Sequence, residues 1–215
     1  MSMINLNNIT MVAVACVRVQ ETLKALKYSY KNISFNSVKL FTHEDIDDDY
    51  IEIINIDKLD YENYNRFIVY ELHKYIDTDF VLIIQDDGYI INPTKWSDNF
   101  FNYDYIGAIW PIPPVTDQIS YRDPLGNLIR VGNGGFSFRS KKLLSLASEL
   151  NLEWTSYFGH YNEDGFFCCH NRHIYEANGC IYAPPEVAKY FSHETEVAEI
   201  RGIKPFGFHR FDPRI

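Results

Sequence analysis

The sequence predicts an α/β fold of three layers, with helices on both faces of a mostly parallel central sheet. Two observations predict it: an almost uninterrupted apolar run near the N-terminus, and a strand, helix, strand order that recurs before Pro93. A chain of 215 residues with 46 % hydrophobic and 23 % charged residues is long enough for one such core and short for two. We therefore expect residues 1–215 to form a single domain.

The first half of this domain, about residues 10–92, contains the repeated pattern. "TMVAVACV" (Thr10–Val17) is rich in β-branched residues and alanine, which is typical of a strand buried on both faces. "ETLKALKYSYKNI" has apolar residues at helical spacing, and "NSVKLFT" predicts the second strand. "YENYNRFIVYELHKYI" then predicts an amphipathic helix that leads into the strand "DFVLIIQ".

The second half, about residues 103–209, does not continue the repeated strand and helix pattern. "YDYIGAIW" predicts another strand, and "NGGFSFRSKKLLSLASEL" predicts a glycine turn, a short strand and a helix. Between them, "PIPPVTDQISYRDPLGNLIRV" is rich in proline and turn residues over a length that compact domains rarely leave structureless. It is either a mobile flap over a site or a surface excursion without a role, and both interpretations stay open.

Charge and composition exclude some classes of function. Lys and Arg total 20 against 29 Asp and Glu, a net charge of -9, which disfavours nonspecific binding to a nucleic-acid backbone. The N-terminal apolar run lacks a preceding basic region and is soon interrupted by Arg18, so we expect neither a signal peptide nor a membrane span. The four cysteines lack the spacing of a zinc site or disulfide framework, which favours a cytoplasmic location.

Asp86 and Asp87 are the first candidates for chemistry, because they follow the strand "FVLII". Ligands of open α/β sheets bind outside the carboxyl ends of the strands, and paired carboxylates there suit a hard divalent cation. Asp-Asp-Gly is also ordinary turn chemistry, which remains the alternative. A literal Asp-x-Asp, residues 77–79, precedes the same strand and should lie at the opposite edge of the sheet.

Three further features carry candidate residues, each with a plainer explanation. The turn "VGNGGFSFRS" would allow the backbone to approach a ligand closely, or it is only a turn. Glu163 and Asp164 open an expected helix, where a carboxylate acts as a general base or simply favours the helix dipole. His209, flanked by aromatic residues, is either a metal ligand or a packed core histidine.

Taken together, these motifs resemble the GT-A class of nucleotide-sugar-dependent glycosyltransferases. "IQDDGYIINPTKW", "YDYIGAIW", "VGNGGFSFRS", "NEDGFF", "APPEVAKYFSHE" and "PFGFH" look like a family of small GT-A-like proteins found in bacteria, fungi and large DNA viruses. The resemblance extends from Thr10 to His209. It also allows the chain to be one domain of a longer protein.

The resemblance implies roles for individual residues. Asp87 and His209 would be ligands of Mn²⁺ or Mg²⁺, although Gln85 replaces the first acidic residue of the family motif and leaves the role of Asp86 open. Glu163 and Asp164 match a Glu-Asp motif that supplies the base in inverting enzymes, and we favour Asp164 slightly. Residues that would contact the nucleotide or donor sugar are Val14, Ala15, Cys16, Arg18, Thr22, Gln85, Asp86, Asn133, Gly134 and Gly135. Trp110 and Trp154 would stack on sugar rings or be buried in the core.

The function expected from the sequence is metal-dependent transfer of a hexose or deoxyhexose from a nucleotide sugar, with a UDP-sugar favoured, to a saccharide hydroxyl. A nucleotidyltransferase is the first alternative, although it commonly has a glycine-rich basic loop after its first strand, which "ACVRVQET" lacks. A nucleotide- or sugar-binding module without turnover is the second.

Overall fold

A computed structural model, which describes residues 3–155 and 162–210, has a central sheet of six strands. In spatial order these are β3 (Glu52–Asn55), β2 (Ile33–Thr42), β1 (Ile4–Val14), β4 (Phe80–Ile84), β9 (Phe136–Ser140) and β6 (Tyr105–Ile106). The first four strands are parallel, whereas β9 runs antiparallel to both of its neighbours. The mixed, mostly parallel sheet confirms the predicted fold class.

The central sheet is buried on both faces, as the continuous apolar run predicted. Along β1, Met11 and Ala13 belong to one core cluster, while Val12 and Val14 belong to the other. This alternation follows from the two-residue period of a strand. β1 begins at Ile4, earlier than the pattern predicted, and ends at Val14.

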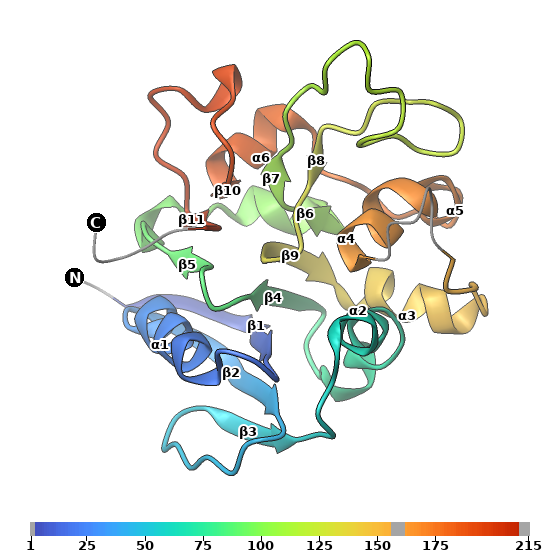
Figure 1. The fold of residues 1–215 in the computed structure, drawn as a ribbon. Coiled ribbons are helices and arrows are strands. Elements are labelled where there is room, and N and C mark those ends of the chain that lie inside the picture. Colours follow the sequence, from blue (N-terminus) through green and yellow to red (C-terminus); the bar gives the residue numbers. More distant parts are fainter. Residues whose placement is uncertain (1–2, 156–161, 211–215) are drawn as a thin grey trace.

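Helices cover the two faces of this sheet (Figure 1). α1 (Val19–Tyr30) packs on one face, and α2 (Tyr61–Tyr70) with α3 (Lys141–Glu149) packs on the other. Side chains cap two of these helices: Asp60 accepts a hydrogen bond from the Asn63 amide at 2.8 Å, and Ser140 accepts one from the Leu143 amide at 3.0 Å. Such caps satisfy amide groups that the first helical turn leaves unpaired.

A second sheet of five short strands lies beside the first. Its spatial order is β5 (Tyr89–Ile90), β11 (Gly207–Phe208), β10 (Ser192–His193), β7 (Ala108–Ile109) and β8 (Val131–Gly132). The strand predicted from "YDYIGAIW" is therefore two strands, β6 and β7, which belong to different sheets. Gly107 lies between them, and glycine is required there because a Cβ would lie 1.6 Å from the carbonyl oxygen of Gly132.

The remaining elements are short. The expected helix after residue 162 is divided into α4 (Glu163–Gly165), a π-helical turn (Phe166–His170) and α5 (Arg172–Ala177). α6 (Pro185–Phe191) packs beside β7, and single 3₁₀ turns cover Leu72–Tyr75, Pro93–Lys95, Asp98–Asn102 and Ala198–Ile200. The proline-rich excursion, residues 111–130, leaves from β7 and returns at β8 (Figure 1).

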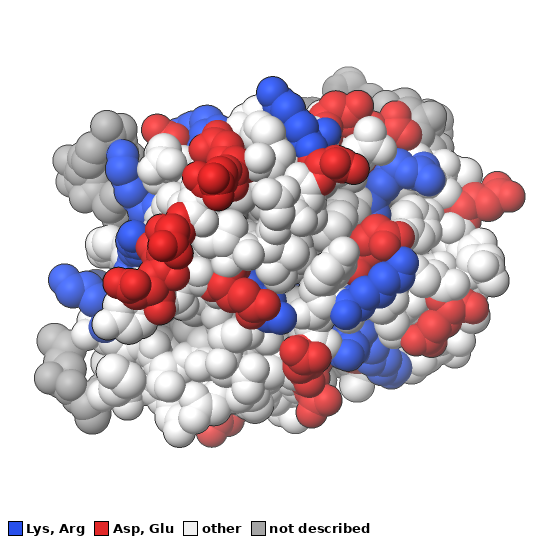
Figure 2. All heavy atoms as spheres, turned by 90° about the horizontal axis from the view of Figure 1, so that it is seen from below, with Lys and Arg blue, Asp and Glu red and all other residues white. Residues whose placement is uncertain are grey.

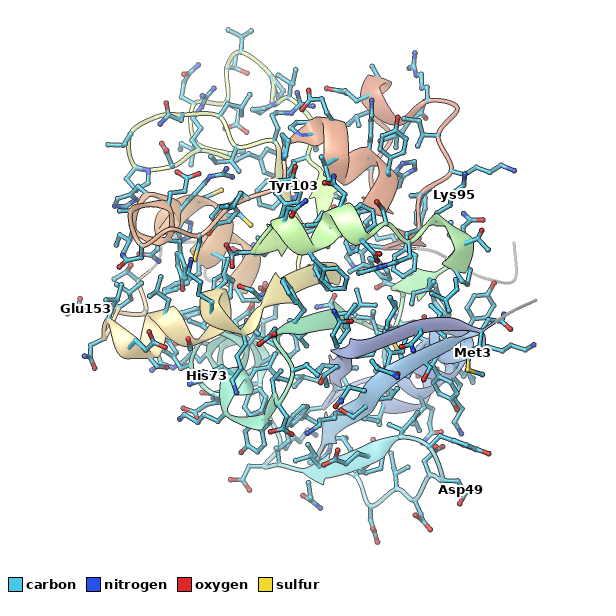
Figure 3. The ribbon with its side chains drawn as sticks, turned by 180° about the vertical axis from the view of Figure 1, so that it is seen from behind. Met3, Asp49, His73, Lys95, Tyr103 and Glu153 are labelled. Atoms are coloured by element: carbon cyan, nitrogen blue, oxygen red, sulfur yellow. The ribbon has the colours of Figure 1, made fainter. Side chains whose placement is uncertain are left out.

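Acidic and basic side chains lie near one another at the surface. Asp49 lies at the periphery beside β3 (Figure 3), and its neighbour Asp48 forms an ion pair with Lys27 at 2.6 Å. Acidic and basic side chains are interspersed over the face seen from below (Figure 2). Within residues 3–155 and 162–210, no helix is both long enough and apolar enough to cross a bilayer.

Candidate functional site

The carboxyl ends of β1 and β4 lie side by side, because these two strands are parallel neighbours. Gln85, Asp86 and Asp87 follow β4 at this edge. The backbone N–H of Gln85 donates to the carbonyl oxygen of Gly135 at 2.9 Å. This hydrogen bond joins residues 85–87, which we call the aspartate segment, to the glycine turn. Asp77 lies at the other end of β4 and is 89 % exposed beside Lys39, as the sequence predicted for this look-alike motif.

A cavity of about 330 Å³ opens at the same edge, between β1 and α2. We call it the β1–α2 cavity. Its lining includes Val14, Ala15, Cys16, Val17, Thr22, Leu59, Asp60, Tyr61, Tyr64, Gln85 and Asp86. The sequence predicted five nucleotide-binding residues in the first strand and helix. Four of them, Val14, Ala15, Cys16 and Thr22, line this cavity together with Gln85 and Asp86 of the aspartate segment.

Arg18, the fifth of these residues, lies at the edge of this arrangement. It precedes α1 with a left-handed backbone, φ 52°, and its guanidinium forms an ion pair with Asp86 at 2.7 Å. Burial and the neighbouring Asp87 raise the pKa of Asp86, and Arg18 acts in the opposite direction. Asp86 is thus held by a cation from the protein itself.

Asp87 contacts His209, the two residues that the resemblance implies as metal ligands. Nε2 of His209 lies 3.1 Å from Oδ1 of Asp87, and Nδ1 lies 3.0 Å from Oε1 of Glu194. Burial lowers the pKa of His209, but its hydrogen bonds to both carboxylates outweigh burial and raise the pKa to about 9. The same contact holds the pKa of Asp87 below its ordinary value despite burial.

The Asn133–Gly135 turn shapes the space around this histidine. A Cβ at Gly135 would lie 2.0 Å from Nε2 of His209, so only glycine allows the ring to occupy its place. Asn133 has a positive φ of 85°, and its Oδ1 accepts a hydrogen bond from the Gly135 amide at 2.8 Å. Asparagine is one of the few residues that tolerate this backbone conformation.

Glu163 and Asp164 have different environments. Glu163 is buried and forms an ion pair with Arg139 at 2.6 Å, and burial raises its pKa to about 7 although Arg139 opposes the rise. Burial also raises the pKa of Asp164, while the amides of Gly165 and Gly134 act against it. A carboxylate with a raised pKa is better matched to proton transfer near neutral pH.

A second cavity of about 230 Å³ lies on the Asp164 side. We call it the β7–α4 cavity, and its lining is Trp110, Ile119, Ser120, Tyr121, Arg122, Asn162, Asp164, Gly165, Cys169, His170, Glu194 and Arg210. The excursion supplies four of these residues, 119–122, so it forms part of a cavity wall. Trp110 packs against Tyr121 with ring centroids 4.8 Å apart and ring planes tilted by 32°, whereas Trp154 stacks on Phe166 and lines neither cavity.

The described residues contain no preformed group of three or more His, Cys, Asp or Glu side chains arranged to hold a metal ion. Asp87 and His209 nevertheless fit a divalent cation as a partial site. They face each other directly, and Nε2 of His209 packs against Gly135, where the absence of a Cβ makes room for the ring. Mg²⁺ and similar ions are commonly held by one or two protein ligands together with substrate phosphates.

Sequence reasoning missed Arg139, Glu194 and Tyr64. Tyr64 accepts a hydrogen bond from Nε2 of Gln85 at 2.8 Å. The signal for Arg139 was a charged residue inside the apolar strand "FSFRS". Glu194 had no signal of its own, since its role depends on the approach of β10 and β11, which pair only in the folded chain.

Comparison with known proteins places the chain in a family. The family model described as "Protein of unknown function (DUF5672)" matches residues 49–209. The chain belongs to this family. The matched range includes Gln85, Asp87, the Asn133–Gly135 turn, Asp164 and His209, but begins after β1 and α1. No curated protein matches the chain.

Comparison with solved structures gives matches at low sequence identity. An active-site mutant of LgtC, a glycosyltransferase of GT-A fold, matches with a TM-score of 0.53 and 12 % identity, covering 95 % of this chain and 88 % of that one. A 4-diphosphocytidyl-2C-methyl-D-erythritol synthase from Anaerococcus prevotii matches with a TM-score of 0.46 and 13 % identity, covering 81 % and 86 %. The likeness to LgtC shows that the fold is GT-A-like.

Proposed function

We propose that this protein is a metal-dependent glycosyltransferase that moves a hexose or deoxyhexose from a nucleotide sugar, most simply a UDP-sugar, to a saccharide hydroxyl. One observation carries the proposal. The contact between Asp87 and His209 lies between two cavities, because Asp86 lines the β1–α2 cavity and Glu194, the other partner of His209, lines the β7–α4 cavity. A donor in the first cavity and an acceptor in the second would meet at this contact.

In this proposal the β1–α2 cavity binds the nucleoside. Val14, Ala15, Cys16 and Thr22 contact the base and ribose, and the ring of Tyr64 lies against the same space with its hydroxyl fixed by Gln85. Arg18 is close enough to Asp86 to exchange that carboxylate for a phosphate of the donor. Because the protein carries a net charge of -9, a diphosphate needs such local cations to bind.

Asp87 and His209 would hold Mn²⁺ or Mg²⁺. The ion, when bound, would offset negative charge on the departing nucleoside diphosphate. Asn133, Gly134 and Gly135 would lie beside the donor sugar, where the absence of side chains on the glycines allows a close approach of the backbone.

Asp164 is the residue we propose as the base that accepts the proton of the acceptor hydroxyl. It lines the β7–α4 cavity, whereas Glu163 is buried against Arg139 and lines neither cavity. The adjacent rings of Trp110 and Tyr121 form an apolar wall of the same cavity, and such a wall suits the face of a saccharide acceptor.

A thermal-shift experiment with nucleotide sugars tests the metal and donor parts of this proposal. UDP-sugars should raise the unfolding temperature more in the presence of Mn²⁺ than in its absence. Asp87→Ala and His209→Ala should each abolish the metal-dependent increment, measured within each variant so that a change in basal stability cancels. Asp77→Ala is the matched control, because it removes an aspartate from the opposite end of β4, and it should retain the increment.

Two outcomes would contradict the proposal: equal shifts with and without the ion, or no shift with any UDP-sugar. Product analysis separates the rival activities. A glycosyltransferase releases UDP from a UDP-sugar, a nucleotidyltransferase releases pyrophosphate from a nucleoside triphosphate, and a binding module releases neither.

A further inference from the structure

Arg139 is a fully buried charge in the middle of the molecule, with 0 % of its side chain exposed. Its guanidinium lies 2.6 Å from Oε2 of Glu163 and 5.0 Å from the ring centroids of both Tyr105 and Phe167. Its Nε donates to Oγ of Ser137 at 3.1 Å. A charge is costly to bury unless it is paired, so this arrangement requires Arg139 and Glu163 together.

Three of the partners of Arg139, namely Glu163, Tyr105 and Ser137, contact the Asn133–Gly135 turn. Oε1 of Glu163 lies against Gly134, where a Cβ would come within 1.7 Å of it. The hydroxyl of Tyr105 donates to the carbonyl oxygen of Asn133 at 2.8 Å, and Oγ of Ser137 donates to that of Gly134 at 3.3 Å. The turn is therefore held from three sides by groups that surround one buried cation.

The same ion pair fixes the start of α4. The backbone N–H of Glu163 donates to Oδ1 of Asn65 on α2 at 2.8 Å, so the residue is held at both its backbone and its carboxylate. Asp164 follows directly. Its Oδ1 accepts a hydrogen bond from the amide of Gly165 at 2.8 Å, and the nearby amide of Gly134 acts to lower its pKa. The direction of the Asp164 side chain thus depends on α4 and on the turn, and both of these contact the buried pair.

We propose that Arg139 is a positioning residue that, through its ion pair with Glu163, holds the carboxylate of Asp164 in place against the Asn133–Gly135 turn. The catalytic consequence rests on the proposed function, in which Asp164 is the base. Arg139 lines neither cavity, so it acts through its neighbours. A pair that only stabilised the fold could be replaced by neutral residues without an effect on the folded molecules.

The double variant Arg139→Met/Glu163→Gln makes this distinction. It removes both charges at once, so no unpaired charge is left in the core, and methionine packs well between aromatic rings. Arg172→Met/Glu176→Gln is the matched control, because it makes the same change in an ion pair at the surface of α5. Both proteins are compared with the wild type by hydrogen–deuterium exchange and by the kcat and KM of UDP release from UDP-sugars with Mn²⁺.

In the Arg139→Met/Glu163→Gln variant, amides of residues 132–136 and 162–166 should exchange faster, whereas those of β1 and β4 should keep their wild-type rates. The kcat should fall by about 100-fold, the effect expected when a catalytic group moves by roughly 1 Å. The KM for the donor should change much less than the kcat, since the β1–α2 cavity proposed to bind the nucleoside does not include either residue. The control variant should match the wild type in all three measurements.

Wild-type exchange and wild-type kcat in the folded double variant would overturn the inference. If the wild type itself releases no UDP from any UDP-sugar, the proposed function fails, and the exchange measurement alone decides the role of Arg139. If the double variant does not fold, Arg139→Lys replaces it, because lysine keeps the charge but lacks the planar guanidinium that contacts both rings. Wild-type exchange and kcat in that variant would equally overturn the inference.

Discussion

At the scale of single residues, the geometry of this site requires glycine where a side chain would collide with a neighbouring residue. Gly135 is the clearest case, because its missing side chain is what allows the ring of His209 to approach Asp87. Sequence reasoning placed the glycine turn, Asp87 and His209 among the candidates, since each residue type indicates its chemistry. It did not find Arg139 or Glu194, because their roles arise from the residues across from them in space. The charge within the apolar strand "FSFRS" marks Arg139 as unusual but does not indicate its partner.

Gly135→Ala should displace His209 and abolish the metal-dependent increment in unfolding temperature. The new methyl group would lie 2.0 Å from Nε2, and overpacking of this kind costs about 1–3 kcal/mol of unfolding free energy. Gly202→Ala is the control: its φ of 74° makes alanine unfavourable there, but no atom lies within 4 Å of the added group. It should lower stability and keep the metal effect. A metal-dependent increment of wild-type size in Gly135→Ala would refute this account of the turn.

At the level of elements, sequence patterns predicted long segments well and short ones poorly. The alternation of strand and helix from β1 to β4 was predicted because each element is long enough to show a period. The two-residue strands of the second sheet carry no such period. The requirement for glycine at position 107, between β6 and β7, comes from the backbone of Gly132, a residue distant in sequence. The π-helical turn Phe166–His170 was also not predicted.

The N-terminus of α2 offers a test at this level, since Asp60 caps the helix and also lines the β1–α2 cavity. Asp60→Ala should lower the free energy of unfolding by about 1 kcal/mol, the usual effect of losing a cap. It should also weaken UDP binding in a titration, because Tyr61 and Tyr64 lie in the first turn of the same helix. Asp60→Asn should restore both properties, as asparagine caps equally well. If it restores stability but not binding, the carboxylate itself contacts the ligand.

For the whole molecule, the pH dependence of stability should show the charge on His209. Its pKa is raised from 6.5 to about 9, so its contribution is fully present below pH 6.5 and is lost as the pH rises through 9. The free energy of unfolding, measured with urea in the presence of a chelator, should fall by about 3 kcal/mol across this range.

His209→Gln should abolish this fall between pH 6.5 and 9. His193→Gln is the matched control, because burial lowers the pKa of His193 below 6.5, so its own contribution changes only at lower pH. An undiminished fall in His209→Gln would mean that another group is responsible.

The excursion of residues 111–130 has a consequence for how relatives of this protein can diverge. It leaves and returns through β7 and β8, whose pairing of Ala108 with Gly132 and Ile109 with Val131 fixes both ends. Insertions and deletions between these ends need not move the Asn133–Gly135 turn that follows directly. Evolution can therefore rebuild one wall of the β7–α4 cavity, and with it the molecules that the cavity admits, while the aspartate, histidine and glycine framework stays as it is.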